Sequence, residues 1–140
     1  MLYGAAFVLG LLVHGLRPTA VLPLQTATLC GLPVLVLGGL LAIWGKRTLQ
    51  RAGTNVDPAL PATVLVVTGP FRFSRNPMYL ARTLLDAGLA LVMNTVWPLI
   101  ALAPLLVLIQ RGVIYRVERY MDAKFGNAYR QYQAQVRRWL

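Results

Sequence analysis

Four apolar segments, at residues 2–16, 20–45, 78–92 and 96–109, constrain the fold of this chain more than any other feature. Hydrophobic residues make up 57% of the sequence and charged residues 13%, whereas soluble domains carry about 25% charged residues. A globule of 140 residues cannot bury such an excess of apolar side chains. The pattern therefore predicts an all-α fold: a single integral membrane domain, residues 1–140, with about four transmembrane helices in a polytopic bundle.

Polar segments complete this layout. Residues 46–77 form a loop rich in turn-forming residues, and residues 110–140 repeat apolar side chains at helical spacing. Gly126 suits the end of one helix and Asn127 the cap of the next, so two C-terminal amphipathic helices are predicted. They either lie on the membrane surface or fold over the spans and cover a site. The N-terminus lacks a basic segment and a clear cleavage site, so we expect a retained span rather than a signal peptide.

The basic residues favour one orientation. The chain has 14 Lys and Arg against 4 Asp and Glu, and 12 of the 14 fall in the 46–77 loop and the tail. The positive-inside rule then places this side, with both termini, in the cytoplasm. A nucleic-acid-binding protein would instead carry its basic residues on a soluble face, so no nucleic acid is expected as a partner.

The sequence offers little conventional catalytic machinery. One cysteine, one histidine and four scattered carboxylates cannot form a metal cluster, so no metal is expected. There is no phosphate-binding loop, dinucleotide-binding glycine pattern, nucleophile elbow or zinc motif. Hydrolysis and phosphoryl transfer therefore have no visible basis.

The segment Thr68–Leu80 is the most informative stretch for chemistry. Asn76-Pro77 predicts a helix start, because Asn is a preferred N-cap and Pro suits the first helical position. The free N–H groups of such a start form an anion site, and Arg72 and Arg75 stand just before it. The alternative is an ordinary capped helix with two arginines at the lipid headgroups.

Charged residues elsewhere give further candidates. Arg82 and Asp86 stand four residues apart on one face of the third apolar segment and can pair. Ionisable residues within a membrane mark a functional site by default, although a structural ion pair or an arginine reaching the headgroups fits the same pattern. Glu118 is the only glutamate. It is either a salt-bridge partner or an acceptor for ribose hydroxyls or an ammonium group.

Two motifs carry a family resemblance. The segment Gly69–Tyr79, GPFRFSRNPMY, resembles the Arg-His-Pro-x-Tyr region of isoprenylcysteine carboxyl methyltransferases and related membrane phospholipid methyltransferases. Glu118 and the run FGNAYRQY at 125–132 resemble their C-terminal Glu-Glu…Phe-Gly-x-x-Tyr-x-x-Tyr segment. Residues 52–58 look like bacterial members in particular. The likeness covers about residues 44–140, with the right order and spacing.

The resemblance implies a multi-span helical enzyme with S-adenosylmethionine bound near the cytoplasmic face, between a membrane-helix start and the C-terminal helices. By position, the cofactor site would be formed by Arg75, Asn76, Pro77, Tyr79, Leu80 and Glu118. The sequence departs from the family pattern at three places. Asn76 stands where His is common, Ala81 where Gly is common, and Val117 where the first Glu of the pair is usual. Val117 is the most serious departure, because it removes a carboxylate that would contact the ribose or ammonium group.

Together these features predict a methyltransferase of a bacterial inner membrane acting on a lipidic or membrane-partitioned acceptor: a carboxylate, thiol or amine. In-line methyl transfer needs alignment and exclusion of water more than a strong base. The scarcity of bases favours an anionic or soft acceptor. Carboxyl O-methylation of an isoprenylcysteine-like group is the reaction most favoured. Arg82 and Arg119 are the candidate catalytic residues that orient the acceptor, and Arg72 and Asp86 the candidate acceptor-binding residues.

Two other classes remain open. NADPH-dependent membrane reductases of the steroid 5-alpha-reductase type have a similar helical layout and C-terminal segment, and Arg72, Arg75 and Arg119 could serve a 2′-phosphate. The Arg-Asn-Pro-x-Tyr segment favours the methyltransferase. A non-enzymatic membrane scaffold or transporter subunit is the third hypothesis. A transporter places its polar residues near mid-membrane, whereas here they gather at one interface.

Overall fold

The computed structural model describes residues 2–55 and 60–140, and within these residues the fold is helical, with no strand. Val56, Asp57 and Pro58 of the bacterial-like segment lie outside the described residues. The elements are a short 3-10 helix η1, a π-helical turn η2 and six α-helices. Their bounds are α1 Leu2–Leu16, α2 Leu24–Arg51, η1 Gly69–Arg72, α3 Pro77–Val92, α4 Trp97–Ile109, η2 Gln110–Ile114, α5 Tyr115–Phe125 and α6 Asn127–Gln135.

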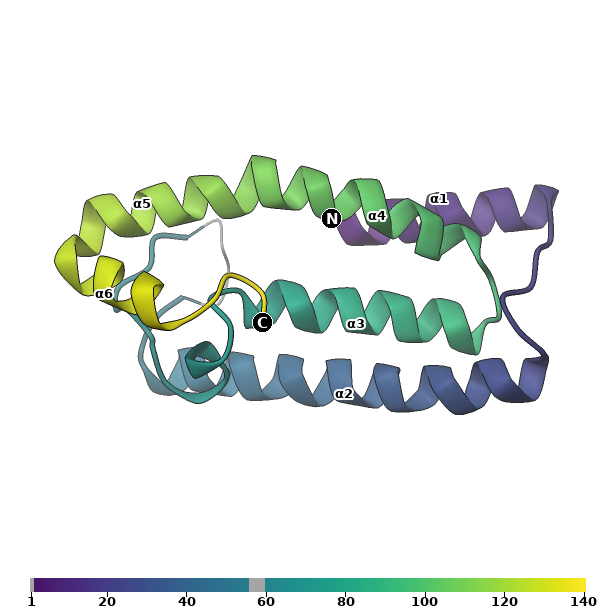
Figure 1. Ribbon diagram of the computed structural model, residues 1–140, viewed down its shortest axis with the longest axis horizontal. Helices are drawn as coiled ribbons and strands as arrows, with labels where there is room; N and C mark the ends of the chain where they lie inside the picture. Colours follow the sequence, from purple (N-terminus) through teal and green to yellow (C-terminus); the bar gives the residue numbers. More distant parts are fainter. Residues whose placement is uncertain (1, 56–59) are drawn as a thin grey trace.

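Two antiparallel helix pairs form the body of the molecule. α2 packs along α3 and α1 along α4, and α3 also contacts α1 and α4 (Figure 1). Glycines bring the backbones of α2 and α3 close together. A Cβ on Gly38 would lie 2.8 Å from the backbone nitrogen of Leu85, and one on Gly88 would lie 2.5 Å from that of Leu35. Small residues that allow such close approach are typical of helix contacts in membranes.

Among residues 2–55 and 60–140, the structure has two helices of spanning length and apolar composition, not the four predicted. They are α2, with 28 residues, and a continuous 29-residue helix, Trp97–Phe125, made of α4, η2 and α5. α1 has 15 residues and α3 has 16. At 1.5 Å per residue these two helices reach only about 22–24 Å, short of the hydrocarbon core of about 30 Å.

The helix bounds also differ from the apolar segments. The second segment was expected at 20–45, but α2 starts after Pro23 and runs on through basic residues to Arg51. The fourth was expected to end at Ile109, but the helix continues through η2 into α5. An apolar segment ends where the chain leaves the bilayer. The helix itself continues into water until a residue interrupts its backbone hydrogen bonds.

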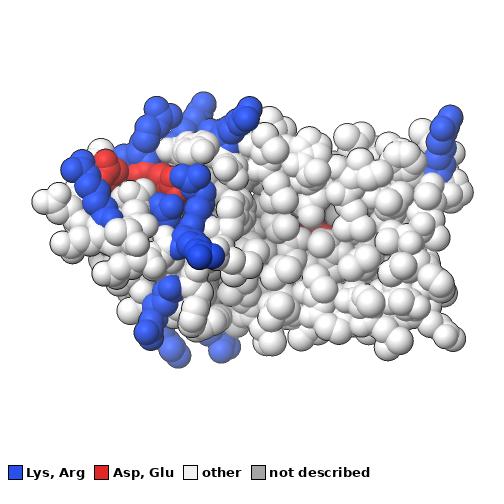
Figure 2. Space-filling model, viewed as in Figure 1, with Lys and Arg blue, Asp and Glu red and all other residues white. Residues whose placement is uncertain are grey.

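The surface of the two long helices is apolar. Only 17% and 22% of the residues in their most apolar stretches are buried, whereas a core helix of a soluble protein is mostly buried. Figure 2 shows basic side chains gathered toward one end, over α5, α6 and the neighbouring loops, beside a broad uncharged surface. Such an apolar belt, bordered by charge, is the surface expected of a protein in contact with lipid.

The C-terminal segment folds back over the loops. Gly126, with a φ of 52°, ends α5 and reverses the chain directly into α6. The predicted N-cap role of Asn127 is wrong, because α6 already begins at this residue and Gly126 holds the cap position. Tyr129, Tyr132 and Val136 then pack in a buried cluster against Leu65, Met121 and Phe125. Of the two alternatives for the tail, the structure supports the one in which it covers a site.

Candidate functional site

A cavity of about 320 Å³ lies between the start of α3, α5, α6 and the loop that follows α2. Its volume is at the lower end of the usual range for small-molecule sites, about 300–1,000 Å³. Leucine, valine and methionine side chains form much of its wall. The polar residues that line it are Tyr3, Thr54, Asn55, Arg75, Asn76, Tyr79, Arg82, Glu118, Tyr129 and Tyr132.

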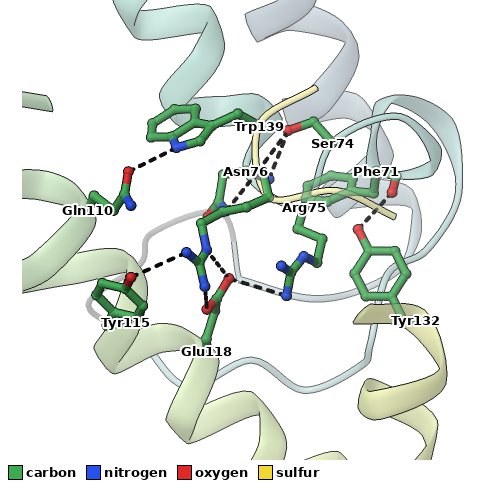
Figure 3. A network of polar contacts seen from close by, with 10 residues as sticks. Phe71, Ser74, Arg75, Asn76, Gln110, Tyr115, Glu118, Tyr132 and Trp139 are labelled. Atoms are coloured by element: carbon green, nitrogen blue, oxygen red, sulfur yellow. Dashed lines mark hydrogen bonds and ion pairs between the residues drawn. The ribbon is translucent and has the colours of Figure 1, made fainter. Parts of the chain in front are cut away.

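Glu118 is the centre of a polar network beside this cavity (Figure 3). Its side chain is 10% exposed. Arg138 binds it in a bidentate manner, with Nε donating to Oε1 at 2.9 Å and Nη2 to Oε2 at 2.8 Å. Arg75 Nη1 lies 3.2 Å from Oε1. A carboxylate accepts about four hydrogen bonds, and these three contacts leave capacity for one more, on Oε2.

Arg138 is itself held firmly in place. Its guanidinium lies 4.6 Å from the centroid of the Tyr115 ring and donates to the Tyr115 hydroxyl at 3.4 Å. The hydrogen bond to Glu118 raises the pKa of Arg138 above its ordinary value. The next residue, Trp139, donates from Nε1 to Gln110 Oε1 at 3.3 Å. The last residues of the chain thus join α5 and η2 to the site.

Residues 74–76 hold the backbone of the same tail. Asn76 Nδ2 donates to the Arg138 carbonyl at 3.1 Å, and Ser74 Oγ donates to it at 3.3 Å. The Arg75 N–H donates to the Arg137 carbonyl at 3.0 Å. Asn76 stands at the N-cap position of α3, but its side chain makes no capping hydrogen bond. The predicted cap role of this side chain is wrong, because the amide donates to the tail instead.

Arg75 carries one unsatisfied donor. Its side chain is 12% exposed, and its buried Nε has no hydrogen-bond partner in the described part of the chain. Buried polar groups normally have a partner. Arg75 also lines the cavity, so its guanidinium adds a positive charge to the cavity wall.

A second polar group borders the cavity, near α1. Arg82 Nε lies 3.4 Å from Asp86 Oδ1, which confirms the predicted pair. The Arg82 guanidinium lies 5.9 Å from the centroid of the Tyr3 ring. The Tyr3 hydroxyl lies 3.0 Å from Thr83 Oγ1. Arg82 and Tyr3 line the cavity, whereas Asp86 is buried behind them.

The structure brings most predicted cofactor residues together. Arg75, Asn76, Pro77, Tyr79 and Glu118 all line the cavity, whereas Leu80 lines a neighbouring apolar groove. Arg72 and Arg119 are exposed and line neither. For Arg119 the reason is helical geometry, since one residue turns the chain by about 100° away from the face of Glu118.

Sequence reasoning missed several residues of the site, among them three tyrosines and one arginine. Tyr129 and Tyr132 were interpreted as packing residues from their spacing, and they do pack, but they also line the cavity. Burial raises the pKa of both phenols, and the Tyr132 hydroxyl donates to the Phe71 carbonyl at 2.6 Å. No local signal marked Tyr3. Arg138 lies in the tail covered by the family resemblance, which assigned it no role. The roles of both residues depend on distant segments meeting.

Comparison with known proteins agrees with this geometry. A family model described as phospholipid methyltransferase matches residues 26–128, most of the chain and most of the cavity wall. The match confirms the resemblance stated from the two motifs. Searches of curated proteins and of solved structures find no match to the chain.

Proposed function

Because this chain belongs to the phospholipid methyltransferase family, we propose that it is an integral membrane enzyme that transfers the methyl group of S-adenosylmethionine to a lipidic or membrane-partitioned acceptor. The single observation that carries the proposal is the cavity beside Glu118, formed by the start of α3 and by the C-terminal helices. Two long apolar helices support the membrane setting.

The residues around the cavity fit this cofactor, which carries a carboxylate, an ammonium group and ribose hydroxyls. The positive charge of Arg75 in the cavity wall is suited to the carboxylate of the cofactor. The remaining capacity of Glu118 Oε2 is suited to an ammonium or ribose hydroxyl. When bound, the cofactor supplies an electrophilic methyl group on a sulfonium, so this chain needs no strong nucleophile of its own.

The residues of the chain then bind and orient the cofactor and the acceptor, and they exclude water. α6 and the residues after it close the cytoplasmic side of the cavity, which favours reaction away from solvent. Arg82, held by Asp86 and Tyr3, is placed to orient an anionic acceptor. We favour a carboxylate acceptor, as in carboxyl O-methylation of an isoprenylcysteine-like group. An oxygen–methyl bond forms as the sulfur–methyl bond breaks, and no proton has to be removed.

The site is proposed to face the cytoplasm of a bacterial cell, with the protein in the inner membrane. The gathered basic residues at that end support this orientation (Figure 2). α1 runs antiparallel to α4, so its N-terminus points toward the same end as α5 (Figure 1). Both termini are then on the cytoplasmic side.

The test is calorimetric titration of the detergent-purified protein with S-adenosylhomocysteine, with NADPH run in parallel. We expect saturable binding of S-adenosylhomocysteine alone. Glu118→Gln should weaken it at least tenfold, whereas Asp122→Asn, which removes the other carboxylate of α5, should leave it unchanged. Asp122 is a matched control because it pairs with Arg130 and lines neither cavity.

The other outcomes decide between the remaining classes. Binding of NADPH alone would move the protein to the reductase class, although Arg72 and Arg119, proposed for a 2′-phosphate there, do not line the cavity. Binding of neither ligand, by a protein shown to be folded, would favour a non-enzymatic scaffold or transporter subunit. After binding of S-adenosylhomocysteine is established, transfer of a labelled methyl group into a membrane lipid extract would identify the acceptor.

A further inference from the structure

A second cavity, an apolar groove of about 690 Å³, lies on the outer side of α2 and the start of α3. It is separate from the candidate active site. Leu49 of α2 lines the site cavity, whereas Arg47 and Arg51 line the groove. Pro77 borders both, and it is fully buried between them. A molecule in the groove is therefore not placed for reaction in the site cavity.

The groove has the length of one lipid leaflet. Its apolar wall includes Leu37 and Leu40 of α2, and its charged end is Arg51. From Leu37 to Arg51 the axis of α2 rises by about 21 Å. One leaflet contributes about half of the hydrocarbon core of about 30 Å. The groove can therefore take an acyl chain at its apolar end and still reach the headgroup region at its basic end.

Two aromatic residues mark the depth of the groove in the bilayer. Trp44 is 47% exposed and Phe73 is 65% exposed, and their ring centroids lie 6.4 Å apart. Both line the groove between its apolar and its basic end. Exposed aromatic rings of this kind gather at the membrane interface, so Arg47 and Arg51 lie at the level of lipid phosphates.

The basic end is suited to an anion. Arg47 and Arg51 are both exposed and stand four residues apart on one face of α2, where like charges repel. Within the described part of the chain neither forms an ion pair. A phosphate between them would relieve this repulsion, and guanidinium groups bind phosphate in a bidentate manner.

We propose that the groove binds one anionic phospholipid of the surrounding bilayer, with its phosphate at Arg47 and Arg51 and an acyl chain along Leu37, Leu40 and Leu84. This lipid is a bound partner and not the methyl acceptor, because the buried wall at Pro77 separates it from the site. It would hold α2, the start of α3 and the Leu140 end of the tail together. The proposal does not depend on the proposed enzymatic function.

Trp44 provides a direct probe of the groove. The protein is placed in phosphatidylcholine nanodiscs, and phosphatidylglycerol with brominated acyl chains is titrated in while tryptophan fluorescence is measured. Brominated phosphatidylcholine serves as the reference lipid. We expect quenching at much lower fractions of phosphatidylglycerol, and Trp44→Phe should remove this preferential component.

Paired charge variants make the test decisive. Arg47→Gln with Arg51→Gln should lower the preference for phosphatidylglycerol about 30-fold, given the contribution of each basic residue near an anionic surface. Arg111→Gln with Arg116→Gln removes the same charge from exposed positions outside the groove and should leave the preference intact. Equal loss in both double variants, or no preference in the unaltered protein, would overturn the proposal.

A second measurement covers loss of folding in the groove variants. Circular dichroism and thermal unfolding are recorded for each nanodisc sample, and we expect phosphatidylglycerol to raise the unfolding temperature only where Arg47 and Arg51 are present. Added inorganic phosphate should not reproduce this rise. If it does, the site binds free phosphate and the lipid proposal is wrong.

Discussion

At the residue scale, Tyr132 shows how one hydroxyl connects the tail to the start of the site. It is buried, it donates to the Phe71 carbonyl, and burial raises its pKa. The folded state therefore keeps the phenol proton more strongly than the unfolded state, whose pKa is about 10. The contribution to stability is complete below that pH and is lost as the pH rises above it.

Tyr132→Phe should reduce the free energy of unfolding by about 0.5–1.5 kcal/mol at pH 7, the usual net value of a hydrogen bond. The variant should also lose less stability than the unaltered protein as the pH rises above 10. The loss that remains comes from Tyr129, whose pKa is also raised by burial. Denaturant unfolding at pH 7 and pH 11 measures both effects. Tyr120→Phe, at an exposed position of α5, is the control. An equally steep alkaline loss in Tyr132→Phe would contradict this account.

The partners of Glu118 show what residue-level reasoning can and cannot supply. A lone glutamate among many arginines predicts an ion pair, and the structure has one with Arg75 and one with Arg138. The sequence could not select Arg138, which is 20 positions away and reaches Glu118 only because Gly126 reverses the chain. The predictions for Arg72 and Arg119 placed both near the reaction, whereas the structure leaves both exposed and outside the cavity lining.

At the element scale, the contact between α2 and α3 depends on glycines of both helices, among them Gly38 and Gly88. A methyl group on Gly88 would lie 2.5 Å from the backbone nitrogen of Leu35. A backbone atom within a packed helix cannot move aside as the end of a flexible side chain can. Gly88→Ala should therefore destabilise the protein by about 1–3 kcal/mol through overpacking. Gly39→Ala on α2, where nothing lies within 4 Å, should not. Thermal unfolding in one detergent compares the two, and equal midpoints would show that the helices tolerate separation.

The π-helical turn η2 sets the direction in which α5 presents Glu118. It inserts Gln110–Ile114 between α4 and α5 within one continuous helix. Inserting one alanine after Tyr115, at the start of α5, should turn the following residues by about 100° and carry Glu118 out of the cavity wall, so that binding of S-adenosylhomocysteine is lost. Gly112→Ala is the control, because nothing lies within 4 Å of the added methyl group. Full binding by the insertion variant would show that the register between η2 and α5 does not position the site.

The elements were only partly visible in the sequence. Apolar segments located all four helices of the body, because each lipid-facing or packed helix needs apolar side chains along its length. Their ends were not visible, since α2 continues into basic residues and α4 continues through η2 into the polar α5. η2 itself has no sequence signature, because a π-turn differs from an α-turn only in its backbone hydrogen bonds.

At the scale of the whole molecule, charge and apolar surface divide the protein along its length. Basic side chains gather at one end of the molecule (Figure 2), the end that carries α5 and α6 (Figure 1). Arg17 directly follows α1, which ends at the opposite end (Figure 1). The uncharged surface between them matches the bilayer interior. In the proposed orientation, the site cavity and the basic end of the proposed lipid groove both face the cytoplasm.

Cysteine labelling tests this orientation. Cys30 is replaced by Ser, since it is exposed on α2, and Arg17→Cys or Arg116→Cys is then introduced. A membrane-impermeant maleimide added to intact spheroplasts should label Arg17→Cys and should label Arg116→Cys only after the membrane is permeabilised. The reverse pattern would place the site outside the cytoplasm, away from the cellular supply of S-adenosylmethionine, and would contradict the proposed enzymatic function as well as the orientation. Arg116 is exposed on α5, so accessibility in permeabilised cells confirms that any protection came from the membrane.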